Sequence, residues 1–275
     1  MLHLCQELVG LFNSQLPGAS IGVNVSESVQ SLPAGGSSIW QTVHPLDVRQ
    51  KQQLKERFGS EAREMPIAIE GTVVIINKSN SLNDLSLDQL RAIFSGKVTN
   101  WKEVRGQDSA ICLYSTESLV GGSLFFTELV LRGEEIDTAM RGYTNAKETE
   151  KAVAQDRNGI GLIPLPAEND VKYPRLHRMA GGPGIEASNE NIRTVRYPLS
   201  GYVYWAFAKE RPEAVTQLLR FTISAPGQLA VQAAGYYPIN PEARTQAAAL
   251  LEGTAGKKPM LVLSSSTPST ARHSR

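Results

Sequence analysis

The sequence predicts an α/β fold, because strand-like and helix-like segments alternate along most of its 275 residues. Three observations support this prediction. Residues 65–77 are dense in β-branched side chains, and residues 160–165 form a short apolar segment typical of a buried strand. Amphipathic helical segments lie at 85–96 and 212–223, and the aromatic run 202–208 is typical of a strand. The alternation favours a largely parallel sheet.

The composition is that of an ordinary globular protein. Hydrophobic residues make up 41% of the chain, charged residues 20%, and the net charge is +1. This near-neutral charge argues against nucleic acid or an anionic membrane as the main partner. No apolar run approaches the ~20 residues that span a bilayer, so we expect no membrane span.

The first helix is predicted at residues 1–18, where Leu4, Leu8 and either Leu11 or Phe12 share one face. The segment lacks the basic region, continuous apolar stretch and cleavage site of a secretory signal. We therefore expect either a cytoplasmic protein or a sequence that starts downstream of the true beginning.

The next elements follow from local periodicity and turn residues. Residues 20–25 alternate apolar and polar side chains, as a strand does, and a Ser/Gly-rich loop follows at 26–38. Residues 45–58 predict a helix with a solvated, charge-rich face. Residues 65–77 predict either a strand pair or one long strand.

Residues 85–101 predict a complete short helix with its own start and stop. Ser86 can cap the start of the helix, and Gln89, three residues later, can complete a capping box by accepting from the Ser86 backbone N–H. Gly96 can end the helix, because glycine readily adopts the left-handed backbone conformation found at helix C-termini. Leu87, Leu90 and Phe94 form an apolar stripe, and Trp101 anchors the chain that follows.

The remaining elements are predicted in the same way. We expect strands at 110–114, 160–165 and 202–208, helices at 121–131, 147–157, 212–223 and 227–234, a loop at 181–184, and a disordered Ser/Thr/Lys-rich tail at 253–275. The aromatic side chains of 202–208 are expected in the core rather than on a ligand-stacking platform.

Cys5 and Cys112 could form one disulfide or remain two thiols, and the burial habit of free cysteine favours the thiols. The four histidines have no metal-binding spacing, so neither a metal nor a cofactor is expected: His3, His44, His177 and His273. The sequence also lacks a nucleophile elbow, a P-loop and a dinucleotide-binding loop. We therefore predict that the protein is not an enzyme.

Four separated segments, 66–80, 85–104, 158–165 and 197–239, match one family in order. The chain resembles the periplasmic phosphate-binding proteins that serve ABC transporters. The resemblance implies a two-lobed, type II periplasmic-binding-protein-like fold that is N-terminally incomplete. Lobe 1 would comprise 1–76 and 200–250 and lobe 2 would comprise 77–199, with two strands crossing between them.

The resemblance also implies a non-enzymatic, periplasmic module that binds phosphate or another small anion in its cleft and serves an ABC transporter permease. The chain departs from the family pattern at the ligand positions. Ser38 stands where the family usually has an acidic residue. Val43 and His44 stand where the family commonly has a serine followed by an arginine. Thr116 replaces an arginine, which would supply both charge and fixed geometry to a buried phosphate.

Most of the candidate ligand residues are uncharged and lie in one loop between a predicted strand and a predicted helix. The free backbone N–H groups and the dipole at the start of that helix, at Gly121 and Gly122, would favour an anion. The full set is Ser38, His44, Ser115, Thr116, Ser118, Gly121 and Gly122. The serines and threonine could equally belong to ordinary loops. A surface or capping role is favoured for His44.

Three functional hypotheses follow. The first is a phosphate-transport-related module with a degenerate cleft. The second is a sensory or protein-interaction module, in which a signalling partner engages the scaffold and no phosphate binds. The third is a truncated but functional transport receptor.

Overall fold

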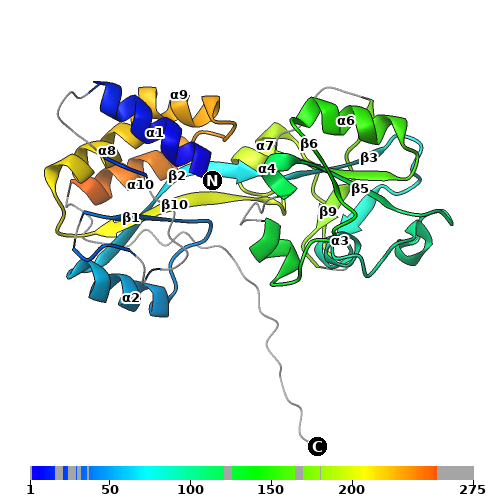
Figure 1. Cartoon of the computed structure of the whole chain (residues 1–275), viewed down its shortest axis with the longest axis horizontal. Helices are drawn as coiled ribbons and strands as arrows, with labels where there is room; N and C mark the ends of the chain where they lie inside the picture. Colours follow the sequence, from blue (N-terminus) through cyan, green and yellow to red (C-terminus); the bar gives the residue numbers. More distant parts are fainter. Residues whose placement is uncertain are drawn as a thin grey trace, which may run out of the picture.

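Two lobes, each built on its own sheet, form the structure, a computed structural model that describes residues 2–15, 21–23, 29, 32–35, 37–120, 126–164, 170–179 and 181–252. Lobe 1 surrounds the three-stranded sheet and lies on the left in Figure 1, and lobe 2 surrounds the five-stranded sheet on the right. Strands β2 (Ala62–Gly71) and β10 (Ser200–Ala208) lie side by side and connect the lobes, with β2 running toward lobe 2 and β10 running back toward lobe 1. The predicted two-lobed α/β fold is confirmed.

The sheet of lobe 1 has the order β1-β10-β2, with β1 at Ile39–Thr42. Both pairings are antiparallel, so the prediction of a largely parallel sheet is wrong for this lobe. The reason is the chain path: β2 carries the chain out of lobe 1 and β10 brings it back alongside. A returning strand runs opposite to its neighbour and needs no crossover helix beside it.

Helices cover both faces of this sheet because the side chains of β10 alternate between two cores. Val203, Trp205 and Phe207 belong to the larger core, whereas Ala206 and Ala208 belong to the smaller one beside α2. The aromatic run is therefore core, as predicted. The helices of lobe 1 are α1 (Leu2–Gln15), α2 (Val48–Phe58), α8 (Glu213–Ile223), α9 (Ala225–Ala233) and α10 (Pro241–Leu251).

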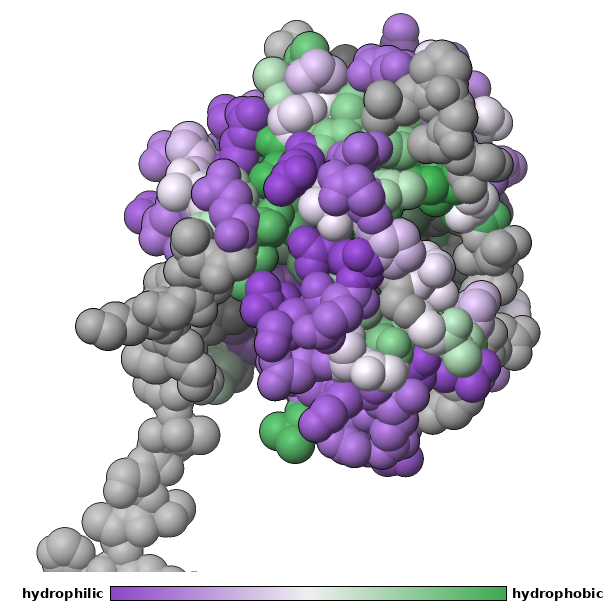
Figure 2. Space-filling view, turned by 90° about the vertical axis from the view of Figure 1, so that its left-hand side faces the viewer, coloured by the Kyte–Doolittle hydropathy of each residue, from purple (hydrophilic) through white to green (hydrophobic). Residues whose placement is uncertain are grey.

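The predicted helical faces of α1 and α2 are confirmed. Leu4, Leu8 and Phe12 of α1 have no exposed surface. In α2, Asp47 and Gln50 form a capping box. Hydrophilic side chains cover much of the outer face of lobe 1, including its lower part, where α2 lies (Figure 2). The charge-rich face of α2 is thus solvated.

The larger sheet of lobe 2 is mixed and has the order β6-β5-β7-β3-β8. Strand β5 runs parallel to both β6 and β7, whereas β3 runs antiparallel to β7 and β8. A separate parallel pair joins β4 to β9. The strands are β3 (Val73–Asn77), β4 (Asp84–Ser86), β5 (Cys112–Thr116), β6 (Arg141–Tyr143), β7 (Gly159–Ile163), β8 (Val171–Lys172) and β9 (Arg175–His177).

The helix predicted within 85–101 is confirmed as α3 (Leu87–Phe94), with the Ser86–Gln89 capping box in place and Gly96 at φ 73°. Trp101 is fully buried, and its indole Nε1 donates to the Asn158 carbonyl over 3.1 Å. The other helical elements of lobe 2 are the 3₁₀ turn η2 (Trp101–Val104), α4 (Glu117–Val120), the π-helical turn η3 (Thr127–Leu131), α6 (Ala146–Gln155) and α7 (Asn189–Arg193).

Other predictions need correction or fall outside the described part of the chain. The segment 65–77 is strand-forming, as predicted, and contains two strands rather than one. They are β2 and β3, which are separated at Thr72, belong to different sheets and do not pair with each other. Of the strand expected at 20–25, residues 21–23 are described and carry no strand. The tail 253–275 lies outside the described residues. The lobe boundaries at 76 and 200 remain a proposal.

Candidate functional site

The predicted ligand residues come from both lobes. Ser38 and His44 flank β1 in lobe 1, and Ser115 and Thr116 end β5 in lobe 2. Ser38 is half-buried and His44 is exposed. In proteins of this architecture, ligands are expected at the carboxyl ends of parallel strands and between lobes. The two groups are therefore on elements that suit a cleft.

The end of β5 carries the most buried polar residues of the set. Ser115 has no exposed surface, and its Oγ has no hydrogen-bond partner. Thr116 is also buried and is the last residue of the strand. A buried hydroxyl without a partner costs free energy, so it is a natural acceptor or donor for a group that enters the site.

The loop after β5 is only partly described. A helical turn, α4, begins at Glu117, directly after the strand. The predicted helix start at Gly121 and Gly122 lies outside the described residues. Ser118 is within α4, but its side chain is also outside the description. The predicted contribution of these three residues to a ligand site stays a prediction.

His44 is not free to face a ligand, because it is paired with Glu128. Its Nε2 lies 3.0 Å from Glu128 Oε2, and the two side chains are 46% and 44% exposed. Its other ring nitrogen, Nδ1, lies 3.3 Å from the Pro45 carbonyl oxygen. Glu128 belongs to η3 in lobe 2, so this contact joins the lobes. Sequence reasoning missed Glu128, since nothing in its local pattern distinguishes it from a solvated carboxylate.

The loop that carries His44 is held at both ends. Thr42 Oγ1 donates to the His44 carbonyl over 3.0 Å, and Leu46 N donates to Glu64 Oε2 over 2.6 Å. Glu64 in turn pairs with Lys51 of α2 at 3.1 Å. These contacts fix the backbone beside His44 and leave its ring as the part that can reorient.

Thr72 marks the point where the chain leaves lobe 1. It has no exposed surface, its N–H donates to the Leu199 carbonyl over 2.9 Å, and its Oγ1 has no partner. Beside it, a Cβ on Gly71 would come within 2.7 Å of Ile192 Cγ2 in α7. The crossover is therefore closely packed, and its second buried hydroxyl was also missed by sequence reasoning.

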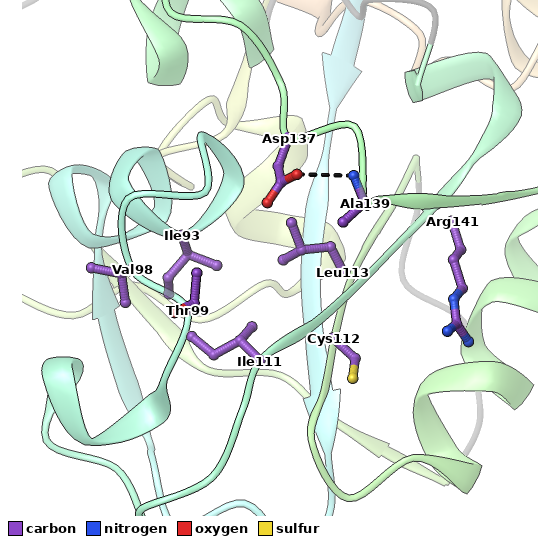
Figure 3. Close-up of a pocket in the computed structure, with 9 residues that line it drawn as sticks. All are labelled: Ile93, Val98, Thr99, Ile111, Cys112, Leu113, Asp137, Ala139 and Arg141. Carbon is purple, nitrogen blue, oxygen red and sulfur yellow. Dashed lines mark hydrogen bonds between the residues drawn. The ribbon is translucent and has the colours of Figure 1, made fainter.

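A cavity lies between α3 and β5 in lobe 2 (Figure 3). Its volume is about 160 Å³, below the ~300 Å³ at which small-molecule pockets usually begin. Asp137 accepts a hydrogen bond from Ala139 N over 2.9 Å. In Figure 3, Leu113 lies between Ile93 of α3 and Arg141 of β6. None of the predicted ligand residues lines this cavity.

Both cysteines are free thiols, as the sequence favours. Burial raises the pKa of Cys5 to about 11, and its Sγ donates to Gln41 Oε1 over 3.0 Å. Burial also raises the pKa of Cys112, with a further contribution from Asp156. Thiols held in the protonated form are poor nucleophiles and metal ligands.

An ionic cluster fastens the short β4–β9 pair. Asp84 accepts two hydrogen bonds of 2.9 Å from Arg175, and His177 Nε2 lies 3.0 Å from the same carboxylate. His177 Nδ1 lies 2.5 Å from the Gly182 carbonyl oxygen. Arg175, through its hydrogen bonds, holds the pKa of Asp84 below its usual range.

We expect Asp84→Asn to lower the free energy of unfolding at pH 7 by ~0.5–1 kcal/mol, the range for a partly exposed, solvent-screened pair. Because the folded pKa of Asp84 is depressed, its contribution is complete above the ordinary aspartate pKa of about 3.9 and disappears as pH falls through the folded value. Urea unfolding at pH 7 and pH 3 measures this difference. In the control, Asp170→Asn removes one exposed contact to Lys78 and should leave stability unchanged; an equal loss in both variants would contradict the assignment.

Within the described part of the chain, no group of three or more histidine, cysteine, aspartate or glutamate side chains could hold a metal ion. The same residues include no helix long and apolar enough to cross a membrane.

A two-lobed α/β scaffold, with a separate sheet in each lobe and two strands joining them, defines a solute-binding-protein architecture. The PBP superfamily domain matches residues 26–226, which are most of the chain. The chain therefore belongs to the PBP superfamily.

Its relatives are consistent with the predicted family. The phosphate-binding protein PstS of Staphylococcus haemolyticus (strain JCSC1435) is 28% identical over 213 residues, which are 74% of this chain and 66% of that protein. PstS of Bacillus subtilis (strain 168) is 28% identical over 153 residues, 54% of this chain and 49% of that protein. The chain thus spans about half to two thirds of these relatives. They are named as binding proteins, not as enzymes.

Solved structures agree on the fold. A possible phosphate binding protein from Planctomyces limnophilus DSM 3776 superimposes with a TM-score of 0.80 at 20% identity, covering 92% of this chain and 95% of the other. A candidate phosphate ABC transporter substrate-binding protein from Clostridium perfringens, with phosphate bound, gives a TM-score of 0.56 at 26% identity, covering 86% and 95%. The predicted kinship with phosphate-binding proteins is confirmed.

Proposed function

We propose that this chain is a non-enzymatic solute-binding module related to phosphate ABC transport, with a cleft that binds phosphate weakly. The proposal includes a periplasmic location and an ABC transporter permease as partner, both transferred from the family. It rests on family membership together with one observation: His44, the single ionisable side chain in the predicted ligand set, is already paired with Glu128.

The electrostatics of the site support weak binding. Phosphate that leaves water needs compensating positive charge, and a bidentate guanidinium supplies it best. At the end of β5 this chain instead offers the hydroxyl groups of Ser115 and Thr116. Neutral hydrogen bonds contribute roughly 0.5–1.5 kcal/mol each, less than bonds to charged groups. Binding without a free cation should therefore be weak.

Equilibrium dialysis of the full chain against labelled phosphate tests the proposal. We expect a dissociation constant weaker than about 1 μM, which corresponds to −8.2 kcal/mol. Ser115→Ala should weaken the residual binding about two- to tenfold, which is the effect of losing one neutral hydrogen bond. It should not lower stability, because the hydroxyl that it removes has no partner within the protein. The matched control is Ser14→Ala on the exposed face of α1.

Two results would contradict the proposal. Sub-micromolar binding would show that the cleft is not degenerate. Phosphate binding that is equally tight in Ser115→Ala and in the unmodified chain would place the ligand away from the end of β5. Complete absence of binding, with a stable partner that co-purifies, would support the second candidate, a sensory or protein-interaction module. The contact between His44 and Glu128 favours that candidate, because it joins side chains of the two lobes directly.

A further inference from the structure

The His44–Glu128 pair connects two parts of the molecule that can move relative to each other. His44 lies in the loop between β1 and α2 of lobe 1, and Glu128 lies in η3 of lobe 2. The chain itself crosses between the sheets at Thr72 and at the start of β10. Lobes joined by two strands can open and close about them as rigid bodies. A contact across the space between them can therefore bias that motion.

Each ring nitrogen of His44 faces a hydrogen-bond acceptor, so the doubly protonated ring could donate to both. Nε2 faces the Glu128 carboxylate and Nδ1 faces the Pro45 carbonyl oxygen, and both of these groups only accept hydrogen bonds at neutral pH. A neutral imidazole has one N–H and can donate to only one of them. The imidazolium form donates to both and adds an ionic attraction, so protonation strengthens the contact between the lobes.

Both partners are held by their own lobes. η3 is fixed to α3, because Arg91 Nε donates to the Val130 carbonyl over 2.8 Å and Val130 and Leu131 are buried. The charged groups on the His44 side are engaged with each other: Glu64 pairs with Lys51, and Asp47 caps α2. Glu128 is thus the carboxylate that faces the imidazole from the opposite lobe.

We propose that His44 and Glu128 form a proton-operated latch that holds the lobes together. Because the protonated ring donates to both partners, the latch is stronger in acid than in base. The latch would regulate opening of the cleft that the proposed function assumes. It rests on the proposed function only in that such a cleft lies between the lobes. Its readout is the distance between the lobes, which is independent of phosphate affinity.

Pulsed electron–electron spin resonance on the full chain measures that distance. Spin labels are attached at Arg49→Cys in α2 and Lys147→Cys in α6, in a background that carries Cys5→Ser and Cys112→Ser. In phosphate-free buffer at low ionic strength, the ratio of closed to open molecules should be about two- to fivefold higher at pH 5.5 than at pH 8, the range for a partly exposed ion pair. High salt should reduce this ratio.

Variants separate the latch from a general effect of pH. Glu128→Gln should remove the pH dependence and lower the closed fraction at pH 5.5. The double variant that exchanges the two side chains, His44→Glu with Glu128→His, should restore the pH dependence and the closed fraction at pH 5.5. The matched control is His3→Gln, which removes the histidine of a pair confined to α1 and should change nothing.

Identical distance distributions for the unmodified pair and Glu128→Gln at pH 5.5 would overturn the proposal. A pH dependence that survives Glu128→Gln would also overturn it. If dialysis detects no phosphate binding while the latch variants behave as expected, the proposed function fails and the latch stands.

Discussion

Trp101→Ala is expected to destabilise the protein by about 3–5 kcal/mol, the cost of removing a large aromatic side chain from a closed core. Trp101 is fully buried in lobe 2, and its indole N–H satisfies the Asn158 carbonyl. The variant would leave a cavity and an unpaired acceptor. Guanidinium unfolding followed by circular dichroism measures the loss.

The conservative variant Trp101→Phe separates the two contributions. It keeps much of the apolar volume and removes the hydrogen bond, so it should cost about 1–2 kcal/mol. Equal losses in the two variants would mean that volume matters little here and that our account of this core is wrong. Because the cores of the two lobes are separate, a two-step transition in Trp101→Ala would be assigned to lobe 2.

Gly227→Ala should cost about 3 kcal/mol, although it adds a single methyl group. A Cβ at this position would lie 2.1 Å from the Phe221 carbonyl oxygen and 2.7 Å from that of Thr222. Both atoms are backbone at the end of α8, so α9 would have to move. Gln228, the next residue, donates to the Thr222 carbonyl over 2.9 Å and would lose this bond with the shift. The shift in the midpoint of thermal unfolding measures the effect.

Gly10→Ala is the matched control, because Gly10 lies inside α1 and an added Cβ would meet nothing within 4 Å beyond the neighbouring backbone of its own helix. Alanine has the higher helix propensity, so this variant should gain about 0.5–1 kcal/mol. If both alanine variants stabilised the protein, the close contact between α8 and α9 would be refuted.

Much of the local structure could be predicted from the sequence because its causes are local. The capping box of α3 needs only Ser86 and Gln89 three residues apart, and both hydrogen bonds form as expected. The apolar faces of α1 and α8 follow from helical spacing in the same way. By contrast, α10 was missed, although Asn240 caps it and Pro241 opens it, a recognisable start signal.

The candidate site could be predicted only in part. Matching to a family pattern pointed to Ser115, Thr116 and His44, and the structure places them at the end of β5 and in the loop after β1. It could not indicate that His44 meets Glu128, because that pairing depends on how two lobes approach each other. Thr72 lacks a local signal for the same reason: its hydroxyl is buried by tertiary packing.

The sequence by itself therefore determined the α/β class, the kinship and the individual helices, since capping, spacing and β-branched runs act over a few neighbouring residues. Only the tertiary structure decided the direction of the strands in lobe 1, because β10 returns beside β2 from a distant part of the chain. It also decided the partner of the one ionisable residue predicted at the cleft. Hydrogen bonds and ion pairs between lobes depend on long-range geometry that local sequence patterns do not contain.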